Sequence, residues 1–211
     1  MYREGYLMDI LVVTGGIGSG KSEVCRILQN SYGCGLYNAD QSVKSLYDRH
    51  PNLLSEVESL VGESLRDDEG RFVPSRLASR IFSDRELLLG VESLVFPALL
   101  EDFNDWMTKA PKRQFVVFES ATILEKPQLA GFGDKVILVD APVRTRLERA
   151  CGRDGATEER IAERMSNQKL MNSISEGKSS ADVDAVIMNS GTLDDLKTEA
   201  LRVIGKLYEN I

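Results

Sequence analysis

The sequence predicts an α/β fold of three layers, in which a five-stranded parallel sheet lies between two layers of helices. Five apolar runs are the candidate strands, at residues 10–14, 36–37, 114–118, 135–139 and 185–188. All but the weak run at 36–37 are continuous rather than alternating, which is typical of strands covered on both faces. Helical patterns separate the runs, and this alternation favours βαβ units.

The predicted helices cover residues 21–30, 142–151, 157–171 and 192–207. The last of these opens with Thr-Leu-Asp-Asp, which is typical of a capping box. One interval breaks the alternation, because residues 41–110 contain helical patterns only, interrupted by prolines and glycines. We therefore expect a helical insertion between the second and third strands.

Composition narrows the class of protein. The chain has 211 residues, 42% hydrophobic and 28% charged, as in ordinary globular proteins, and its length suits one domain with a small insertion. The net charge of −7 does not favour binding to nucleic acid or to an anionic membrane, and no apolar run reaches transmembrane length. The three cysteines form no CxxC pair, which favours a reducing cytoplasm. His50, the only histidine, leaves no histidine cluster for a triad or a zinc site.

A glycine-rich loop follows the first predicted strand. Gly15, Gly20, Lys21 and Ser22 fit the P-loop pattern G-x-x-x-x-G-K-S/T, with a strand before it and a helical pattern after it. Glycines let several backbone N–H groups face one anion, and the helix start adds partial positive charge. A glycine turn that merely caps a helix is the alternative, and the full match disfavours it. The residues expected to contact the nucleotide are Gly16, Ile17, Gly18, Ser19, Gly20, Lys21, Ser22 and Glu23.

Carboxylates stand at the ends of three predicted strands, where ligands gather in open α/β sheets. Asp40 could accept the proton of an attacking hydroxyl, although a role as the cap of the next helix fits the sequence equally well. Glu119 could hold Mg²⁺ through water or contact the acceptor, and Asp140 is the other strand-end candidate. For these two, an exposed acid without a role is at least as good an interpretation.

Arginines are concentrated in one segment of this acidic chain: Arg144, Arg146, Arg149, Arg153, Arg160 and Arg164. Arg146, Arg149 and Arg153 have the spacing of one helix face, and the helical pattern breaks at 153–155 before another begins at Thr157. Two helices joined by an arginine-bearing turn are typical of a lid whose guanidinium groups stabilise a transition state over a triphosphate. A solvated amphipathic face is the alternative, and the P-loop in the same chain favours the lid.

Five segments together resemble the dephospho-CoA kinase family, in order and over nearly the whole chain. They are TGGIGSGKS at 14–22, NAD at 38–40, SLVFP at 93–97, VILVDAPVRTRLERACGRDG at 136–155 and VIMNSGTLDDL at 186–196. The glycine loop alone is common to very many proteins. The ordered set is much more specific.

The resemblance implies an ATP-dependent, Mg²⁺-using kinase that phosphorylates the 3′-hydroxyl of the ribose of dephospho-CoA, the last step of CoA synthesis. It also implies one P-loop NTPase-type domain with three regions. The regions are a nucleotide core at about 8–40, 111–150 and 172–211, a helical CoA-binding insertion at about 41–110, and a lid at about 151–171. We expect a cytoplasmic monomer whose partners are ATP and dephospho-CoA.

The resemblance assigns roles to matching residues. Lys21 and Ser22 become the phosphate and metal residues. Asp40 becomes the base that orients the acceptor hydroxyl. Arg153 becomes the lid arginine over the nucleotide, and Asn189 falls near its adenine. These assignments make Asp40, Lys21 and Arg153 the expected catalytic residues.

Several positions depart from the family pattern. Asn38 stands where the family often has an aspartate, Phe96 replaces the histidine of its usual His-Pro pair, and Glu23 occupies a place where threonine is common. Near Asp182 the family often has an arginine, for which Lys178 is a candidate substitute. We expect these departures to change affinity rather than remove activity, because the loop, the base and the lid arginine remain.

Two other functions fit parts of the sequence. A P-loop kinase for another small hydroxyl acceptor, such as a nucleoside or a sugar acid, is the first, although the long insertion favours a large acceptor. A nucleotide-gated switch is the second, although the chain shows no N-K-x-D guanine motif, added interaction domain or coiled coil. The leader at residues 1–7 precedes Met8, which would be a natural start.

Overall fold

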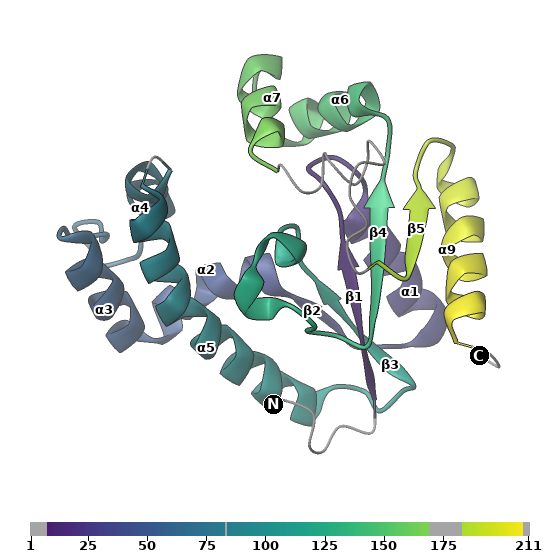
Figure 1. Cartoon of the computed structure of the whole chain (residues 1–211), viewed down its shortest axis with the longest axis horizontal. Helices are drawn as coiled ribbons and strands as arrows, with labels where there is room; N and C mark the ends of the chain where they lie inside the picture. Colours follow the sequence, from purple (N-terminus) through teal and green to yellow (C-terminus); the bar gives the residue numbers. More distant parts are fainter. Residues whose placement is uncertain (1–7, 83, 169–182, 209–211) are drawn as a thin grey trace. The chain divides into compact units, whose positions relative to one another are not determined.

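The computed structural model describes residues 8–82, 84–168 and 183–208. They belong to two compact units (Figure 1). The core unit comprises Met1–Tyr37 and Ala110–Ile211, and the helical unit comprises Asn38–Lys109. The predicted leader at residues 1–7 and the positions of Lys178 and Asp182 lie outside the described residues.

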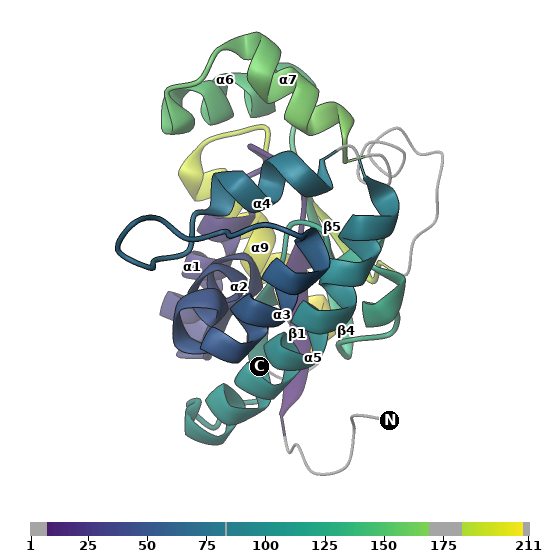
Figure 2. The same cartoon turned by 90° about the vertical axis from the view of Figure 1, so that its left-hand side faces the viewer.

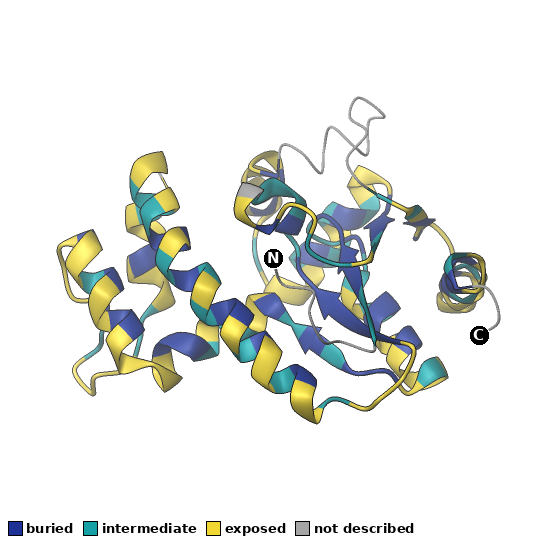
Figure 3. Ribbon diagram, turned by 60° about the horizontal axis from the view of Figure 1, so that its bottom comes forward, coloured by how far each residue is buried: buried dark blue, intermediate teal, exposed yellow. Residues whose placement is uncertain are grey.

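The core unit is built on a five-stranded sheet with the strand order β2-β3-β1-β4-β5. The strands are β1 Asp9–Thr14, β2 Leu36–Asn38, β3 Phe115–Glu119, β4 Lys135–Asp140 and β5 Ala185–Met188. β1 pairs in parallel with β3 and with β4, and β4 pairs in parallel with β5. The central strands are buried (Figure 3), as their continuous apolar sequences require. The predicted α/β fold with a five-stranded parallel sheet is confirmed.

The register of the sheet determines what surrounds the loop after β1. Val13 pairs with Glu119 of β3, and Thr14 pairs with Leu138 of β4. The loop that follows Thr14 therefore begins between the carboxyl ends of β3 and β4. This is the edge of an open α/β sheet at which ligands bind.

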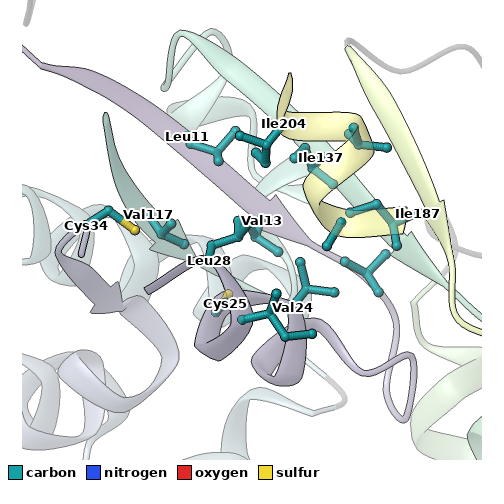
Figure 4. Close-up of a cluster of buried hydrophobic side chains, with 14 of the residues drawn as sticks. Leu11, Val13, Val24, Cys25, Leu28, Cys34, Val117, Ile137, Ile187 and Ile204 are labelled. Atoms are coloured by element: carbon teal, nitrogen blue, oxygen red, sulfur yellow. The ribbon is translucent and has the colours of Figure 1, made fainter. Parts of the chain in front are cut away.

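Two helices, α1 Lys21–Tyr32 and α9 Leu193–Leu207, pack on the sheet through one apolar cluster (Figure 4). Leu28 of α1 and Ile204 of α9 are fully buried there. Full burial of such a side chain stabilises the fold by about 1.5–3 kcal/mol. The predicted capping box of α9 is confirmed, because Thr192 accepts a hydrogen bond from Asp195 N–H and donates one to its carboxylate.

The helices α6 Val143–Asp154 and α7 Glu158–Ser166 follow β4 and lie at its carboxyl end (Figure 1). Gly155 ends α6 with a positive φ of 60°, so the predicted break in this segment is confirmed. A small apolar cluster joins the two helices through Ala150, Ile161 and Met165. The last residues of the helix predicted over 157–171 lie outside the described residues. Two short 3-10 helices, Ile123–Glu125 and Pro127–Leu129, connect β3 to β4.

The helical unit comes between β2 and β3 in the sequence. It contains α2 Ala39–Arg49, α3 Pro51–Val61, α4 Pro74–Ile81 and α5 Arg85–Lys109, with α3 packed on α5 (Figure 2). An ion pair of 2.6 Å between Arg49 and Asp102 joins α2 to α5. The expectation of helices only needs one correction, because Arg66 and Phe72 form an isolated antiparallel bridge. The bridge brings the Phe72 ring to 4.2 Å from the Tyr47 ring, measured between centroids.

Among the described residues, no helix has both the length and the apolar character needed to cross a membrane.

Candidate nucleotide-binding site

The loop that joins β1 to α1 has the backbone geometry of an anion-binding loop. Gly18 and Gly20 have positive φ values of 75° and 94°, which glycine adopts readily and other residues do not. The Ser19 N–H donates to the Gly16 carbonyl at 3.1 Å and closes a turn. Gly20 precedes α1 without a side-chain cap, so the helix start can offer N–H groups to an external acceptor, apart from that of Glu23, which donates to the Gly20 carbonyl at 3.0 Å.

Three buried polar atoms around this loop have no hydrogen-bond partner among the described residues: Thr14 Oγ1, Ser19 Oγ and Arg146 Nη2. An unsatisfied buried donor or acceptor costs about 1–3 kcal/mol. Native proteins contain few such atoms, and each one needs an explanation. Their concentration around one loop is expected of a polar ligand site and not of a purely structural turn.

Ser22 joins the loop to the end of β3. Its hydroxyl donates a hydrogen bond of 2.5 Å to Glu119 Oε1. Glu119 is only 3% exposed, so its interpretation as an exposed strand-end acid is wrong. The same interpretation is wrong for Asp140, which is buried at the end of β4. Both acids are therefore buried at the carboxyl end of the sheet, where the loop begins.

The donor set at Ser22 suits Mg²⁺. A hydroxyl and a carboxylate are the hard oxygen ligands that Mg²⁺ prefers, and Mg²⁺ is commonly held by one or two protein oxygens together with substrate phosphates. The described part of the chain holds no group of three or more His, Cys, Asp or Glu side chains that could bind a metal by themselves. Ser22 and Glu119 are therefore the residues here that fit a nucleotide-bound Mg²⁺.

Glu23 follows Ser22 but engages a different partner. Its carboxylate accepts hydrogen bonds from Nε and Nη2 of Arg26, one helical turn further along α1. These bonds raise the pKa of Arg26. The Glu23 carboxylate, which the sequence places next to Ser22, thus pairs with Arg26 in this structure.

Asn189 lies against the loop from the end of β5. Its Nδ2 donates to the Ser19 carbonyl at 2.9 Å, and its backbone N–H donates to the Asp140 carbonyl at 2.7 Å. Arg149 donates to both the backbone carbonyl and Oδ1 of Asn189, at 3.3 and 3.4 Å. A Cβ on Gly20 would lie 2.1 Å from Asn189 Nδ2, so this contact requires glycine at position 20 as well.

The three arginines predicted to share a helix face have different environments. Arg146 is 1% exposed and packs against the loop, Arg149 is half-buried beside Asn189, and Arg153 is exposed. Arg153 pairs with Asp154 at 2.6 Å, and Asp154 also pairs with Arg164 of α7 at 2.7 Å. The hydrogen bonds from Arg153 and Arg164 hold the pKa of Asp154 well below its usual range. Arg153 and Asp154 both belong to α6, so the Asp154–Arg164 contact is the one that crosses the turn between α6 and α7.

Asp40 lies in the first turn of α2, in the helical unit, and its side chain is exposed. Its alternative interpretation as the helix cap is wrong. The N-cap residue is Asn38, whose Oδ1 accepts a hydrogen bond of 2.9 Å from Gln41 N–H. Asn38, at a position where the resemblance leads one to expect aspartate, therefore caps the helix that carries Asp40. The assignment of Asp40 as the base stays a prediction.

Sequence reasoning did not identify Gln168, which follows α7. Its Oε1 accepts a hydrogen bond of 2.8 Å from the Ile17 N–H of the loop, and the residue is 6% exposed. No motif or spacing distinguishes this glutamine, which lies 151 residues away from Ile17 in the sequence. The only local signal is its place just after an arginine-rich helix pair.

Comparison with known proteins agrees with this geometry. The sequence model of one family, dephospho-CoA kinase, matches residues 9–195. The dephospho-CoA kinase of Porphyromonas gingivalis strain W83 is 35% identical over 186 residues, which are 87% of either chain. The dephospho-CoA kinase of Thermobifida fusca is 31% identical over 199 residues, covering 94% of this chain and 96% of that one.

A solved structure, TT1252 from Thermus thermophilus, is also similar. It has a TM-score of 0.79 and 27% sequence identity, and the match covers 96% of this chain and 100% of that one. The fold described above is therefore shared with that structure over nearly the whole chain.

Proposed function

Because the chain belongs to the dephospho-CoA kinase family, we propose that it transfers the γ-phosphoryl group of ATP to the 3′-hydroxyl of the ribose of dephospho-CoA, giving CoA and ADP. The observation that carries this proposal is the family match over residues 9–195, which includes the loop and the carboxylate at its metal-binding serine. The reaction class is phosphoryl transfer to an alcohol. Catalysis of such a reaction depends on positioning and on charge stabilisation.

The loop supplies the positioning of the donor. Gly18 and Gly20 set the path of the backbone, and the first N–H groups of α1 face an anion. Lys21 opens α1 and contributes a cation that reaches the β- and γ-phosphates. Together these groups hold the terminal phosphate in one orientation while charge moves toward the leaving oxygen.

Ser22 and Glu119 would hold the Mg²⁺ that accompanies ATP. When bound, the ion neutralises part of the charge on the β- and γ-phosphates. Glu119 accepts a hydrogen bond from the Ser22 hydroxyl and so holds the serine oxygen in place at the first turn of α1. Glu119 is buried, so water competes little for its contact with Ser22.

Asp40 acts as the general base for the hydroxyl group of the acceptor substrate. Its carboxylate accepts the proton of the attacking hydroxyl and orients that oxygen in line with the γ-phosphorus. Arg153, at the end of α6, contributes positive charge over the nucleotide after exchanging its contact with Asp154 for the phosphate. The support for both roles is the match to the family motifs at residues 38–40 and 136–155.

A comparison of acceptors tests the proposal. ADP release is measured with Mg-ATP alone and with dephospho-CoA, adenosine, cytidine, uridine monophosphate or gluconate. We expect stimulation by dephospho-CoA and none by the others. Stimulation by another acceptor but not by dephospho-CoA would point to a different small-molecule kinase. Nucleotide-dependent binding of a partner without ADP release would indicate a switch.

We further propose a cytoplasmic monomer. Three cysteines without a CxxC pair support a reducing compartment. Cys25 and Cys34 are buried in the core unit and carry no disulfide. Sedimentation of the purified protein with and without Mg-ATP tests the oligomeric state.

A further inference from the structure

One residue of the phosphate loop, Ile17, is held at both ends of its backbone. Its N–H donates to Gln168 Oε1 at 2.8 Å, and its carbonyl accepts from Arg146 Nε at 3.1 Å. Gln168 and Arg146 are 6% and 1% exposed, so water does not compete for either bond. The two bonds come from different elements, since Arg146 belongs to α6 and Gln168 follows α7.

The Ile17 side chain adds a third contact with the same two helices. It packs against the apolar cluster of Ala150 from α6 with Ile161 and Met165 from α7. A residue fixed through its N–H, its carbonyl and its side chain has little freedom to rotate its peptide groups. The position of Ile17 therefore depends on how α6 and α7 pack against the loop.

This attachment bears on anion binding, because the loop turns immediately after Ile17. Gly18 has a φ of 75°, and the next N–H, of Ser19, closes a turn on Gly16. The Ile17 N–H is committed to Gln168 and is not offered to a phosphate. If the peptide group between Ile17 and Gly18 rotated, the Ile17 carbonyl would leave Arg146 and the Gly18 N–H would change direction, which would alter the set of N–H groups that the loop offers to an anion.

Arg146 also fills the space around the loop glycines. A Cβ on Gly16 would lie 2.0 Å from Arg146 Nη2, and a Cβ on Gly18 would lie 2.0 Å from the Arg146 carbonyl oxygen. Glycine at both positions therefore avoids a clash with α6. At Gly18, the positive φ is a second reason for glycine. The close fit makes the shape of the loop depend on this one helix.

The charge of Arg146 is only partly compensated. Its Nη1 lies 3.5 Å from Asp140 Oδ1, and its buried Nη2 has no partner among the described residues. Burial lowers the pKa of the guanidinium, and Asp140 opposes that shift. A guanidinium stays protonated in proteins, so a buried cation lies directly behind the loop and raises the potential felt by an anion there.

We propose that Gln168 and Arg146 are positioning residues for the phosphate loop. Through them, nucleotide affinity depends on how α6 and α7 pack against Ile17. The inference rests on the proposed nucleotide site. It assigns a function to one residue outside every motif, Gln168, and gives the arginine-rich segment a role besides that of a lid.

Gln168→Met provides the test, because it removes the acceptor and keeps a side chain of similar length. We expect the dissociation constant of MgADP, measured by calorimetry, and the KM for ATP to rise about tenfold, as for loss of one buried hydrogen bond. The KM for dephospho-CoA should stay unchanged. Asn167→Met, at the adjacent exposed position, is the matched control and should bind MgADP as the wild type does. Gln168→Glu keeps the acceptor but adds a negative charge beside the loop, so it should restore the thermal midpoint while MgADP affinity stays below that of the wild type.

Arg146→Lys separates hydrogen bonding from charge. Lysine keeps the cation but has no donor at the Nε position, so we expect weaker MgADP binding in this variant as well. Thermal midpoints of all variants identify any that fail to fold. A folded Gln168→Met protein with a lowered midpoint and wild-type MgADP affinity would overturn the inference, because the contact would then serve stability alone. Failure of the wild type to bind MgADP would instead contradict the proposed function.

Discussion

The Ser22 hydroxyl donates a hydrogen bond of 2.5 Å to the Glu119 carboxylate, which joins the first turn of α1 to the end of β3. The two residues are 97 positions apart in the sequence, and the parallel pairing of β1 with β3 brings them together. Ser22 belongs to a recognisable motif, whereas Glu119 is identified as its partner only by the fold. The first prediction tests the proposal that this pair holds Mg²⁺.

Glu119→Gln should raise the Mg²⁺ concentration needed for half-maximal activity by about 10- to 100-fold. The amide still accepts a hydrogen bond from Ser22 but carries no charge, so it holds the cation more weakly. Titration of activity with Mg²⁺ at fixed ATP measures the effect. Glu199→Gln on α9, whose half-buried carboxylate pairs with Arg202, is the control. An unchanged Mg²⁺ requirement in Glu119→Gln would remove Glu119 from the metal site.

Asp40→Asn should lower kcat by about 10²- to 10⁴-fold, the usual contribution of a general base. Binding of MgADP should not change, because the base acts on the acceptor and not on the donor nucleotide. Single-turnover rates and calorimetry measure the two quantities separately. Asp48→Asn, an exposed position on the same helix, is the matched control. Turnover near the wild-type rate in Asp40→Asn would reject the assignment.

The fold could be predicted because its signals are local. The apolar runs that became β1, β3 and β4 have the composition of strands buried on both faces, and the loop motif fixes what joins β1 to α1. Boundaries differ by a residue or a few, since the last residues of a strand or helix depend on caps such as Gly155 rather than on composition. The local pattern was also sufficient for the capping box of α9.

The site could be predicted only in part, because several of its contacts are distant in sequence. The arginine spacing of α6 predicts a lid or a solvated face, with the lid favoured by the P-loop, and neither predicts that Arg146 is buried against Gly16. Asn38 and Asp40 are both good cap residues, and the backbone alone decides that Asn38 is the cap. No sequence pattern identifies Gln168, because a single side-chain amide that accepts one hydrogen bond from a backbone N–H produces no periodicity in the sequence.

Asp154→Asn should lower the thermal midpoint at neutral pH by about 2–4 °C, the size expected for a partly exposed ion pair in a chain of this length. Arg153 and Arg164 hold the pKa of Asp154 below its usual range, so the carboxylate stabilises the fold above the unfolded pKa, near pH 4. That stabilisation is lost as the pH falls from there toward the lower folded pKa.

The difference between the wild type and Asp154→Asn should therefore be largest at pH 6–8 and shrink steadily below about pH 4. Thermal scans across this range at low salt measure it, with Asp68→Asn at an exposed position as the control. A difference that is constant with pH would show that the carboxylate contributes no charge interaction between α6 and α7.

Alanine substitutions at Gly16 and Gly152 distinguish the effect of a steric clash from the effect of helix propensity. An alanine at Gly16 would place its Cβ 2.0 Å from Nη2 of Arg146, a side chain that is buried and bonded to Ile17. Arg146 would have to move, so Gly16→Ala should weaken MgADP binding about tenfold and lower the thermal midpoint. Gly152→Ala, on an exposed face of α6 with no atom near the new Cβ, should instead raise the midpoint by about 2–4 °C through helix propensity.

The double variant Gly16→Ala with Arg146→Met isolates the cause of the Gly16 effect. If Arg146 is the group that clashes, the cost of Gly16→Ala in thermal midpoint should become much smaller once the guanidinium is gone. Contacting residues give such non-additive effects, whereas independent positions add. Gly152→Ala combined with Arg146→Met is the additive reference, since the alanine there meets nothing. Full additivity of Gly16→Ala with Arg146→Met would mean that the loop glycine is required for a reason other than its contact with α6.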